Sequence, residues 1–323
     1  MKMKKVLSIV LAAIMVVTLL AACGGTKAAT KMTMGTGGTA GTYYAFGGVL
    51  GQYIKNKAGI EVNVVSTDGS KANIESIDSG DYQLGTVQSD VMAYAWAGSR
   101  SFESNGAINS FRVVGGLYAE AVQLITMDPN VKSVADLAGK SVSIGAPGSG
   151  TYFNAMDVLG AAGLTEADIK PQYQSFADST DALKDGKIDA AFIVAGAPTA
   201  AITELCTTNS AYLVPIDGEV ADKLMADSPY YTAYTIPAGT YAGQTEDVTT
   251  VTVKATLIVA ASASEDDVYK LTKAIFDNAD AIASENGKGA ELSVENATTG
   301  MAAPFHAGAA KYYAEKGVTV ETK

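Results

Sequence analysis

A glycine-rich loop occurs twice in this chain, and matching patterns follow both copies. The first copy reads MGTGGTAGTYY at 34–44, and the second reads IGAPGSGTYF at 144–153, which aligns with one deletion. In each copy a short apolar run enters the loop, and a Thr-aromatic-aromatic sequence then begins a predicted helix. A duplication of this kind favours two similar structural units.

The parallel continues beyond the loops. In both copies a strand, a polar loop, a helix and a second strand follow the first helix. The strands are predicted over 61–66 and 82–87 in the first copy and over 171–176 and 188–194 in the second. Gly80 and Gly186 stand where the helices end, which is the usual place for a left-handed residue. Each copy therefore reads β-loop-α-β-loop-α-β, the unit of a doubly wound α/β sheet. The prediction is a two-lobed fold with a ligand cleft between the lobes.

The start of the chain predicts export. Lys2, Lys4 and Lys5 precede an apolar run over 6–20, which is shorter than the ~20 apolar residues that span a bilayer. LAACGG at 20–25 matches a bacterial lipobox, so Cys23 is the predicted lipidation site; an ordinary signal peptide with a chance cysteine is the alternative. The predicted location is extracytoplasmic, with the lipid holding the protein to the outer face of the cell membrane or in the periplasm.

These patterns give a domain plan. Two strand-like segments, 121–127 and 251–260, are expected to cross between the lobes. The plan comprises a lipoprotein signal peptide at 1–22, a tether at 23–30, the first part of lobe 1 at 31–125, lobe 2 at 126–250, and a return to lobe 1 at 251–323.

Composition excludes several classes of function. The chain has 23 Lys and Arg against 34 Asp and Glu, and its formal net charge of −11 argues against nucleic-acid binding. His306 is its single histidine, and Cys206 lacks a cysteine partner if Cys23 is lipidated, so neither a zinc site nor an intramolecular disulfide is expected. No cofactor is predicted.

The predicted cleft lies where the strands of both lobes end and helices begin. Helix N-termini present free N–H groups and partial positive charge, which favour carboxylates. We expect the anion to be held mainly by these groups and by the hydroxyls of Thr39, Thr42, Ser149 and Thr151, because the only arginines, Arg100 and Arg112, are expected outside the cleft. The predicted ligand-binding residues are Gly38, Thr39, Thr42, Tyr43, Ser70, Gln88, Ser89, Gly148, Ser149, Gly150, Thr151 and Gly196.

Six stretches together carry a family resemblance. They are GTGGTAGTYY at 35–44, DYQLGTVQSD at 81–90, APGSGT at 146–151, ALKDGKIDA at 182–190, IPAGTY at 236–241 and HAGA at 306–309. In order and spacing the chain resembles the TAXI family of TRAP-transporter substrate-binding proteins over 31–318. The resemblance implies a periplasmic-binding-protein fold that closes on small organic anions, glutamate-like amino acids and dicarboxylates prominent among them. It also implies delivery to TRAP membrane permease subunits, driven by an ion gradient.

One position departs from the family pattern. The family typically has Thr-Gly-Gly-Ser in the second loop, whereas this chain has TDGS at 67–70. Asp68 places a carboxylate near the rim of the cleft, which favours a ligand that carries an ammonium group.

Three classes of function are consistent with the sequence. The first is a transport receptor, expected to be a monomer. The second is a surface-anchored ligand sensor for a membrane kinase. The third is a secreted enzyme, for which GTGGTA at 35–40 satisfies the dinucleotide fingerprint G-x-G-x-x-G/A. Because the loop is duplicated and the chain carries an export signal, the sequence favours the receptor and predicts no catalysis.

Overall fold

The computed structural model describes residues 30–323, so the predicted signal peptide, Cys23 and nearly all of the tether lie outside the described residues. The strands of this part are β1 (Lys31–Gly35), β2 (Glu61–Val65), β3 (Leu84–Gln88), β4 (Phe111–Thr126), β5 (Ser141–Ser143), β6 (Lys170–Gln172), β7 (Ala190–Ala195), β8 (Tyr212–Val214), β9 (Thr232–Ile236) and β10 (Val248–Ala260). The helices are α2 (Thr42–Ala58), α3 (Ser70–Asp78), α4 (Ser89–Ala97), α5 (Gly150–Ala161), α6 (Phe176–Lys184), α7 (Ala200–Thr208), α8 (Gly218–Asp227), α9 (Glu265–Phe276), α10 (Ala279–Glu285), α11 (Val294–Thr298) and α12 (Ala307–Glu315). Short 3₁₀ turns are η1 (Arg100–Phe102), η2 (Val134–Leu137), η3 (Glu166–Asp168) and η4 (Gly287–Glu291).

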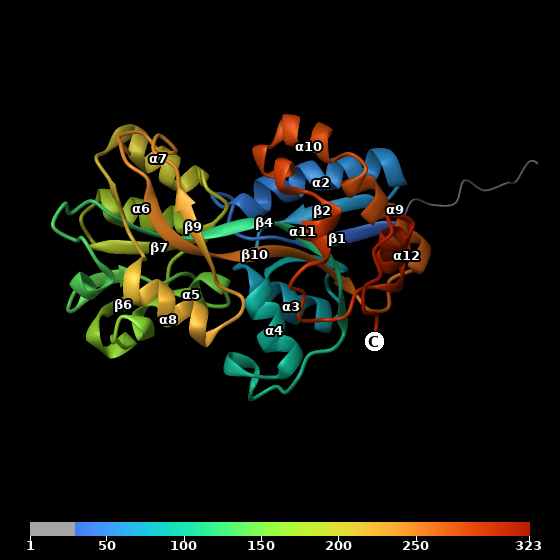
Figure 1. Ribbon diagram of the computed structural model, residues 1–323, viewed down its shortest axis with the longest axis horizontal. Helices are drawn as coiled ribbons and strands as arrows, with labels where there is room; N and C mark the ends of the chain where they lie inside the picture. Colours follow the sequence, from blue (N-terminus) through green and yellow to red (C-terminus); the bar gives the residue numbers. More distant parts are fainter. Residues whose placement is uncertain (1–29) are drawn as a thin grey trace, which may run out of the picture. The chain divides into compact units, whose positions relative to one another are not determined.

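The duplication seen in the sequence is present in the fold. The first copy forms β1-α2-β2-α3-β3, and the second forms β5-α5-β6-α6-β7. Within each copy the strands pair in parallel, β2–β1–β3 in the first and β6–β5–β7 in the second. Figure 1 shows helices on both sides of these strands, with α2 above and α3 and α4 below in the first copy. The predicted α/β fold is therefore confirmed.

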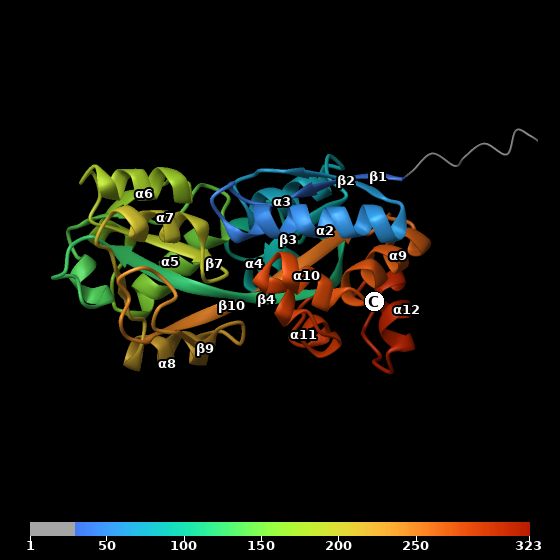
Figure 2. The same ribbon diagram turned by 90° about the horizontal axis from the view of Figure 1, so that it is seen from above.

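Two long strands join the two copies into one sheet. β10 pairs antiparallel with both β3 and β4, and β4 pairs antiparallel with β7. The strand order is β2-β1-β3-β10-β4-β7-β5-β6, while β8 also pairs with β4 and β9 with β10. Figures 1 and 2 show β4 and β10 running side by side from one copy to the other. Sequence reasoning predicted a strand-like crossing at 121–127, whereas the structure makes this segment the end of a strand of 16 residues that begins at Phe111.

The hydrophobic side chains form separate cores around the two copies. One core contains Phe46, Leu50 and Ile74 together with Leu271 and Tyr313, so the C-terminal helices pack back on the first copy. The cores around the second copy include Val142, Phe192 and Ile202. We use "first lobe" for β1–β3, α2–α4 and α9–α12, and "second lobe" for β5–β9 and α5–α8. The domain boundaries given above stay a prediction.

Local sequence explains how several helices begin. Ser264 caps α9, where its hydroxyl accepts a hydrogen bond from the backbone N–H of Asp267 at 3.3 Å, as its S-x-x-D pattern indicates. His306 caps α12, where its Nδ1 accepts from the N–H of Gly308 at 3.1 Å. Within residues 30–323, no helix combines the length and the apolar character needed to cross a bilayer.

Asn73 holds the loops of the first lobe together. Its side chain is fully buried, and its Nδ2 donates to the carbonyls of Thr36 (2.6 Å) and Thr86 (2.8 Å). Its Oδ1 accepts from the hydroxyl of Thr67 at 2.8 Å. One amide, carried by α3, therefore connects the segments that follow β1 and β2 with strand β3.

Replacing Asn73 by alanine should destabilise the protein strongly. The change leaves two buried carbonyls and a hydroxyl without these partners, and each costs about 1–3 kcal/mol, so we expect a loss of roughly 3 kcal/mol in the free energy of unfolding. Urea denaturation measures it. Asn63→Ala, at an exposed position on β2, is the control and should change stability by less than about 0.5 kcal/mol. Equal effects of the two changes would contradict this role.

Candidate ligand-binding site between the lobes

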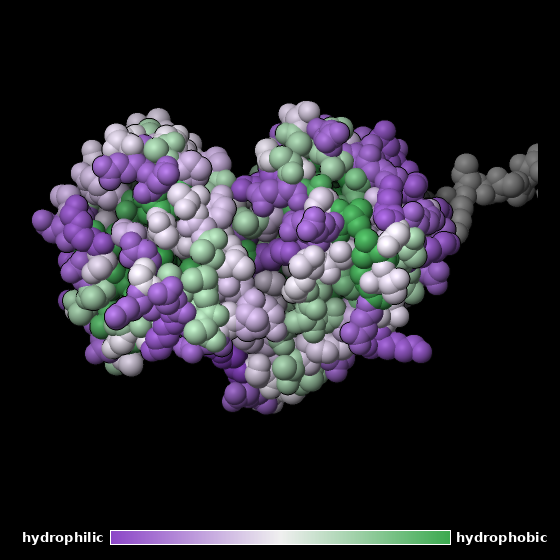
Figure 3. Space-filling view, viewed as in Figure 1, coloured by the Kyte–Doolittle hydropathy of each residue, from purple (hydrophilic) through white to green (hydrophobic). Residues whose placement is uncertain are grey.

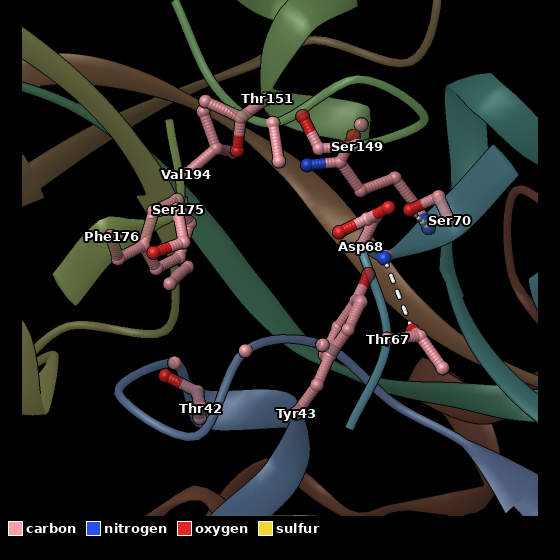
Figure 4. A pocket seen from close by; sticks show the side chains of 18 of the residues that line it. Thr42, Tyr43, Thr67, Asp68, Ser70, Ser149, Thr151, Ser175, Phe176 and Val194 are labelled. Carbon is pink, nitrogen blue, oxygen red and sulfur yellow. Dashed lines mark hydrogen bonds between the residues drawn. The ribbon is translucent and has the colours of Figure 1, made fainter. Parts of the chain in front are cut away.

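A cavity lies where strands of both lobes end. It is lined by the segments after β1, β2, β5 and β6 and by the last residues of β3 and β7, so all six strands of the duplicated units contribute. Doubly wound sheets bind ligands at this edge, beyond the carboxyl ends of their strands. In Figure 4 side chains from both lobes, such as Tyr43 and Ser70 from the first and Thr151 and Phe176 from the second, surround the same space. In the space-filling view of Figure 3 the surface is hollowed between the regions of α7 and α10.

The cavity is small. Its volume is about 70 Å³. One water needs about 10–15 Å³, so there is room for on the order of five waters. This volume fits a compact metabolite rather than a peptide or a nucleotide.

Four helices begin at the cavity wall. Thr42, Ser70, Gly150 and Phe176 are the first residues of α2, α3, α5 and α6, and all four line the cavity. The helix N-caps of α2 and α3 are glycines, whose backbone has no side chain to accept the first N–H groups. Two N–H groups at the start of α3 donate to a carbonyl of the second lobe, so the N–H groups of α2 and the partial positive charge of the helix ends are what favour a negatively charged group here.

Glu120 brings a carboxyl group to the same cavity. It lies on β4, is 2 % exposed, and its Oε2 accepts a hydrogen bond from the hydroxyl of Tyr43 at 2.9 Å. Burial raises the pKa of Glu120 well above its usual value, which outweighs the opposing effects of Tyr43, Gln88 and Lys288. Burial and the neighbouring Glu120 also raise the pKa of Tyr43. A ligand cation beside Glu120 would restore its charged form.

Gln88 supplies a second buried polar group. It is 2 % exposed, lines the cavity, and its Oε1 has no hydrogen-bond donor within the described part of the chain. The neighbouring Gly150 comes from the other lobe, and a Cβ atom at position 150 would overlap Gln88 Oε1 and crowd the hydroxyl of Ser70. Glycine at 150 therefore lets the second lobe approach the first.

The charge of the wall is unusual for an anion site. Among the described residues that line the cavity, Asp68 and Glu120 are acidic and none is Lys or Arg. Arg100 instead pairs with Asp157, and Arg112 lies over the ring of Trp96 at 5.3 Å. Lys288 is engaged with Glu291 at 2.8 Å. Any anionic group must therefore depend on helix N-termini and hydroxyls, as the sequence indicated, while two carboxyl groups are available for a cation.

The structure brings most of the predicted binding residues together. Those that line the cavity are Gly38, Thr42, Tyr43, Ser70, Gln88, Ser149, Gly150 and Thr151. Ser149 is the N-cap of α5 and accepts from the N–H of Tyr152, which leaves its hydroxyl proton free to donate. Thr42 instead donates its proton to the carbonyl of Gly196 at 3.0 Å. Their role in binding stays a prediction.

Four predicted residues lie outside the cavity wall. Thr39 is exposed on its loop, and the hydroxyl of the buried Ser89 accepts from the N–H of Lys254. The carbonyl of Gly148 accepts from the N–H groups of Lys71 (3.0 Å) and Ala72 (3.3 Å) across the cleft. Gly196 likewise accepts from Thr42 of the other lobe. These two glycines connect the lobes instead of facing the cavity.

Sequence reasoning missed several residues of the wall, among them Glu120, Gln174, Ser175, Phe176 and Val194. It predicted a strand over 171–176, but β6 ends at Gln172 and α6 already begins at Phe176. The signal was present, because S-F-A-D at 175–178 is an S-x-x-D pattern, and the hydroxyl of Ser175 accepts from the N–H of Asp178 at 3.2 Å. Glu120 gave no such signal, since it lies inside a long apolar strand.

Trp96, Tyr152 and Cys206 pack against other side chains outside the cavity wall. Trp96 packs against Phe111, with ring centroids 5.5 Å apart, and Tyr152 packs against Phe153 and Tyr173, so neither aromatic side chain lines the cavity. Cys206 is buried in the core of the second lobe. Within residues 30–323, no three His, Cys, Asp or Glu side chains are grouped closely enough to hold a metal ion.

The sequence of this chain matches the model of the NMT1-like family over residues 34–317, nearly the whole described part. The chain belongs to the NMT1-like family. This match establishes the family without distinguishing the TAXI subfamily that the motifs resemble.

Solved structures support the fold of this NMT1-like protein. It is similar to a protein from Bordetella bronchiseptica RB50, with 18% identity, a TM-score of 0.54, and coverage of 82% of this chain and 78% of that one. It is also similar to the alkanesulfonate-binding protein SsuA from Xanthomonas axonopodis pv. citri bound to MOPS, with 17% identity, a TM-score of 0.51, and coverage of 89% and 91%. A third similar structure, provisionally assigned as an L-cystine ABC transporter from Listeria monocytogenes, shows 17% identity, a TM-score of 0.51, and coverage of 82% and 98%. At these identities the likeness concerns the fold alone.

Gly150→Ala should oppose the approach of the two lobes. The added methyl group meets Gln88 and Ser70, so we expect a larger radius of gyration by small-angle X-ray scattering than for the original chain. Gly160→Ala lies on the same helix, where a Cβ atom meets nothing within 4 Å, and it is the matched control. A Gly150→Ala variant as compact as the control would show that the close approach is unimportant.

Proposed function

We propose that this protein is an extracytoplasmic solute-binding receptor, which captures a small organic anion or amino acid between its lobes and delivers it to a membrane permease without catalysis. The observation that carries the proposal is the cavity, whose wall combines four helix N-termini drawn from both lobes with the buried Glu120. The NMT1-like family match supports the proposal, and so does a fold shared with an alkanesulfonate-binding protein.

Charge favours an amino acid over a simple dicarboxylate. The helix N-termini and the hydroxyls of Ser149 and Thr151 suit a carboxylate, whereas Glu120 and Asp68 suit an ammonium group. A dicarboxylate would bring two negative charges beside two acidic side chains, with no Lys or Arg among the described lining residues to offset them. Glutamine-like or glutamate-like amino acids match both sets of groups and the cavity volume.

The partners follow from the proposed role. The stretches quoted above resemble TAXI receptors, so we propose TRAP membrane permease subunits as the recipient of the ligand. We also propose that lipid on Cys23 keeps a monomeric receptor at the membrane surface. These assignments depend on motif resemblance and on the lipobox at 20–25.

A panel of ligands tests the binding function. The chain from Gly24 onward, unfolded and refolded to remove any carried ligand, is heated with amino acids, dicarboxylates and keto acids. A ligand that binds only the folded state stabilises it by about 2.7 kcal/mol at a hundredfold excess over Kd. We expect a rise of several degrees in Tm for one class of amino acid. No shift with any member of the panel would contradict the proposed ligand class.

Removing the two hydroxyl groups should weaken binding by at least tenfold. Ser149→Ala with Thr151→Ala deletes two donors at the start of α5, and calorimetric titration measures the loss of affinity. Loss of the Ser149 cap alone costs about 1 kcal/mol of stability, so Ser264→Ala is the matched control. That variant removes the same kind of cap away from the cavity and should bind normally. Unchanged affinity in the double variant would remove these hydroxyls from the site.

Glu120→Gln distinguishes the two ligand classes. It keeps the size of the side chain and a carbonyl that accepts from Tyr43, but it cannot become an anion. We expect affinity for the amino acid to fall by at least tenfold, because the charge-assisted contact with its ammonium group is lost. Affinity for a matched dicarboxylate should stay equal or rise. The reverse order would assign the site to dicarboxylates.

A further inference from the structure

A buried polar cluster joins the lobes away from the cavity wall. Asp90 lies in the first turn of α4 in the first lobe, and Asn154 belongs to α5 of the second. Asn154 Nδ2 donates to Asp90 Oδ2 at 2.9 Å and lies 2.8 Å from the hydroxyl of Tyr231. That hydroxyl donates to Asp157 Oδ2 at 2.9 Å. Arg100 of the first lobe donates to the other oxygen of Asp157 at 2.6 Å.

Two acceptor atoms in this cluster have no donor. Asp90 and Asn154 are both 0 % exposed, and within the described part of the chain neither Asp90 Oδ1 nor Asn154 Oδ1 has a hydrogen-bond partner. The two unpartnered oxygens belong to side chains that already contact each other through their remaining polar atoms. Buried polar groups are nearly always hydrogen-bonded, so this pair needs an explanation.

The charges around Asp90 do not compensate for its burial. Asp157 faces it from α5, with Tyr94 on α4 and Tyr230 and Tyr231 from the segment before β9, and Glu120 on β4 also interacts with it. Arg100 is the nearby cation, but it is paired with Asp157. Backbone N–H groups at the start of α4 and Asn154 favour the anion. Burial outweighs them and raises the pKa of Asp90 to about 7.

We propose that Asp90 is a proton-binding site between the lobes, and that closing the lobes takes up one proton from solvent onto its carboxyl group. The proton forms an O–H on Oδ1, which can donate to Asn154 Oδ1 and so satisfies both unpartnered oxygens with one bond. Opening exposes the carboxyl group and returns the proton to solvent. The inference uses the lobe closure of the proposed function, but it holds whatever the ligand is.

The proton linkage has a definite sign. Asp90 has a raised pKa in the closed form and an ordinary value, about 3.9, when exposed. The equilibrium constant for closure is therefore largest at low pH and falls by up to about tenfold per pH unit as the pH rises from about 4 to about 7. Above about pH 7 the contribution of Asp90 is constant. An ammonium ligand on Glu120 would give the opposite trend, so the Asp90 effect must be isolated by substitution.

Carbon-13 NMR of aspartate-labelled protein tests the site directly. The full chain is titrated as purified and after refolding, and the carboxyl resonance missing from Asp90→Asn is assigned to Asp90. Scattering identifies the compact form. We expect Asp90 to titrate near pH 7 in the compact form, and near its ordinary value in an expanded form. Titration of Asp90 near pH 4 in the compact form overturns the proposal. The proposal also fails if the protein never becomes compact and Asp90 titrates near pH 4 throughout.

Variants separate a proton site from a merely structural contact. Asparagine at position 90 can donate Nδ2 to Asn154 Oδ1, so Asp90→Asn should close well and lose the part of the pH dependence due to Asp90. Asp157→Asn removes the partner of Arg100 but keeps the titrating group, so its pH dependence should persist with a lower midpoint.

Scattering compares how the compaction of the wild type and of each variant changes between about pH 5 and about pH 8, with and without L-glutamine. A wild-type slope retained in Asp90→Asn would overturn the proposal. Failure of L-glutamine to bind would count against the proposed function alone, because the NMR titration does not depend on it.

Discussion

The pairing of β4 with β10 is the constraint on which the site depends. These two strands run antiparallel from Thr252 opposite Ala121 to Ala260 opposite Phe111, and they continue into pairs with strands of both lobes. Register shifts between Lys254 and Thr256, and again between Leu257 and Ile258, mark irregular points in the ladder, where strands bend and twist. The parallel strands of each lobe are joined to these two strands, through β3 in the first lobe and β7 in the second. The carboxyl ends of the parallel strands therefore meet at one cavity.

Contacts between the lobes complete the cavity. The carbonyl of Gly148 receives two N–H groups from the start of α3, and the carbonyl of Ala40 receives the N–H of Ala201 at 3.2 Å. The helix ends thus lie against the opposite lobe as well as the cavity. In the proposed receptor a ligand at this place contacts both lobes, so its binding energy would favour the closed arrangement over the open one. The contact between Asp90 and Asn154 also joins the lobes, so the proposed proton site outside the cavity wall is linked to the same closure.

The fold was readable from the sequence because its decisive signals are local. The order of the elements and the loops that form much of the cavity wall could be predicted from three signals. These are the two similar glycine-rich loops, the glycines that end helices, and the alternating apolar runs. Gly148 and Gly196 were chosen for the right loops, but their carbonyls turned out to connect the lobes. A loop can be located from sequence, whereas the direction in which each carbonyl or side chain faces depends on packing.

Glu120 and Asp90 show where sequence reasoning ends. Glu120 sits in an apolar strand, and only the spatial pairing of β4 with its neighbours brings it to the cavity beside Tyr43. Asp90 follows the predicted binding residues Gln88 and Ser89, yet it lies outside the cavity wall, against Asn154, 64 residues away in the chain. Contacts over such separations arise only from the tertiary fold.

Native mass spectrometry of the chain purified without refolding would decide whether the cavity holds a small molecule. If the cavity is the binding site, the spectrum should show one bound compound whose mass matches that of an amino acid. The bound mass should be absent from the Ser149→Ala, Thr151→Ala variant and present in Ser264→Ala. Equal occupancy in all three proteins would place the ligand elsewhere. A spectrum without any bound compound, together with no binding of amino acids added in high excess, would contradict the proposed receptor function itself.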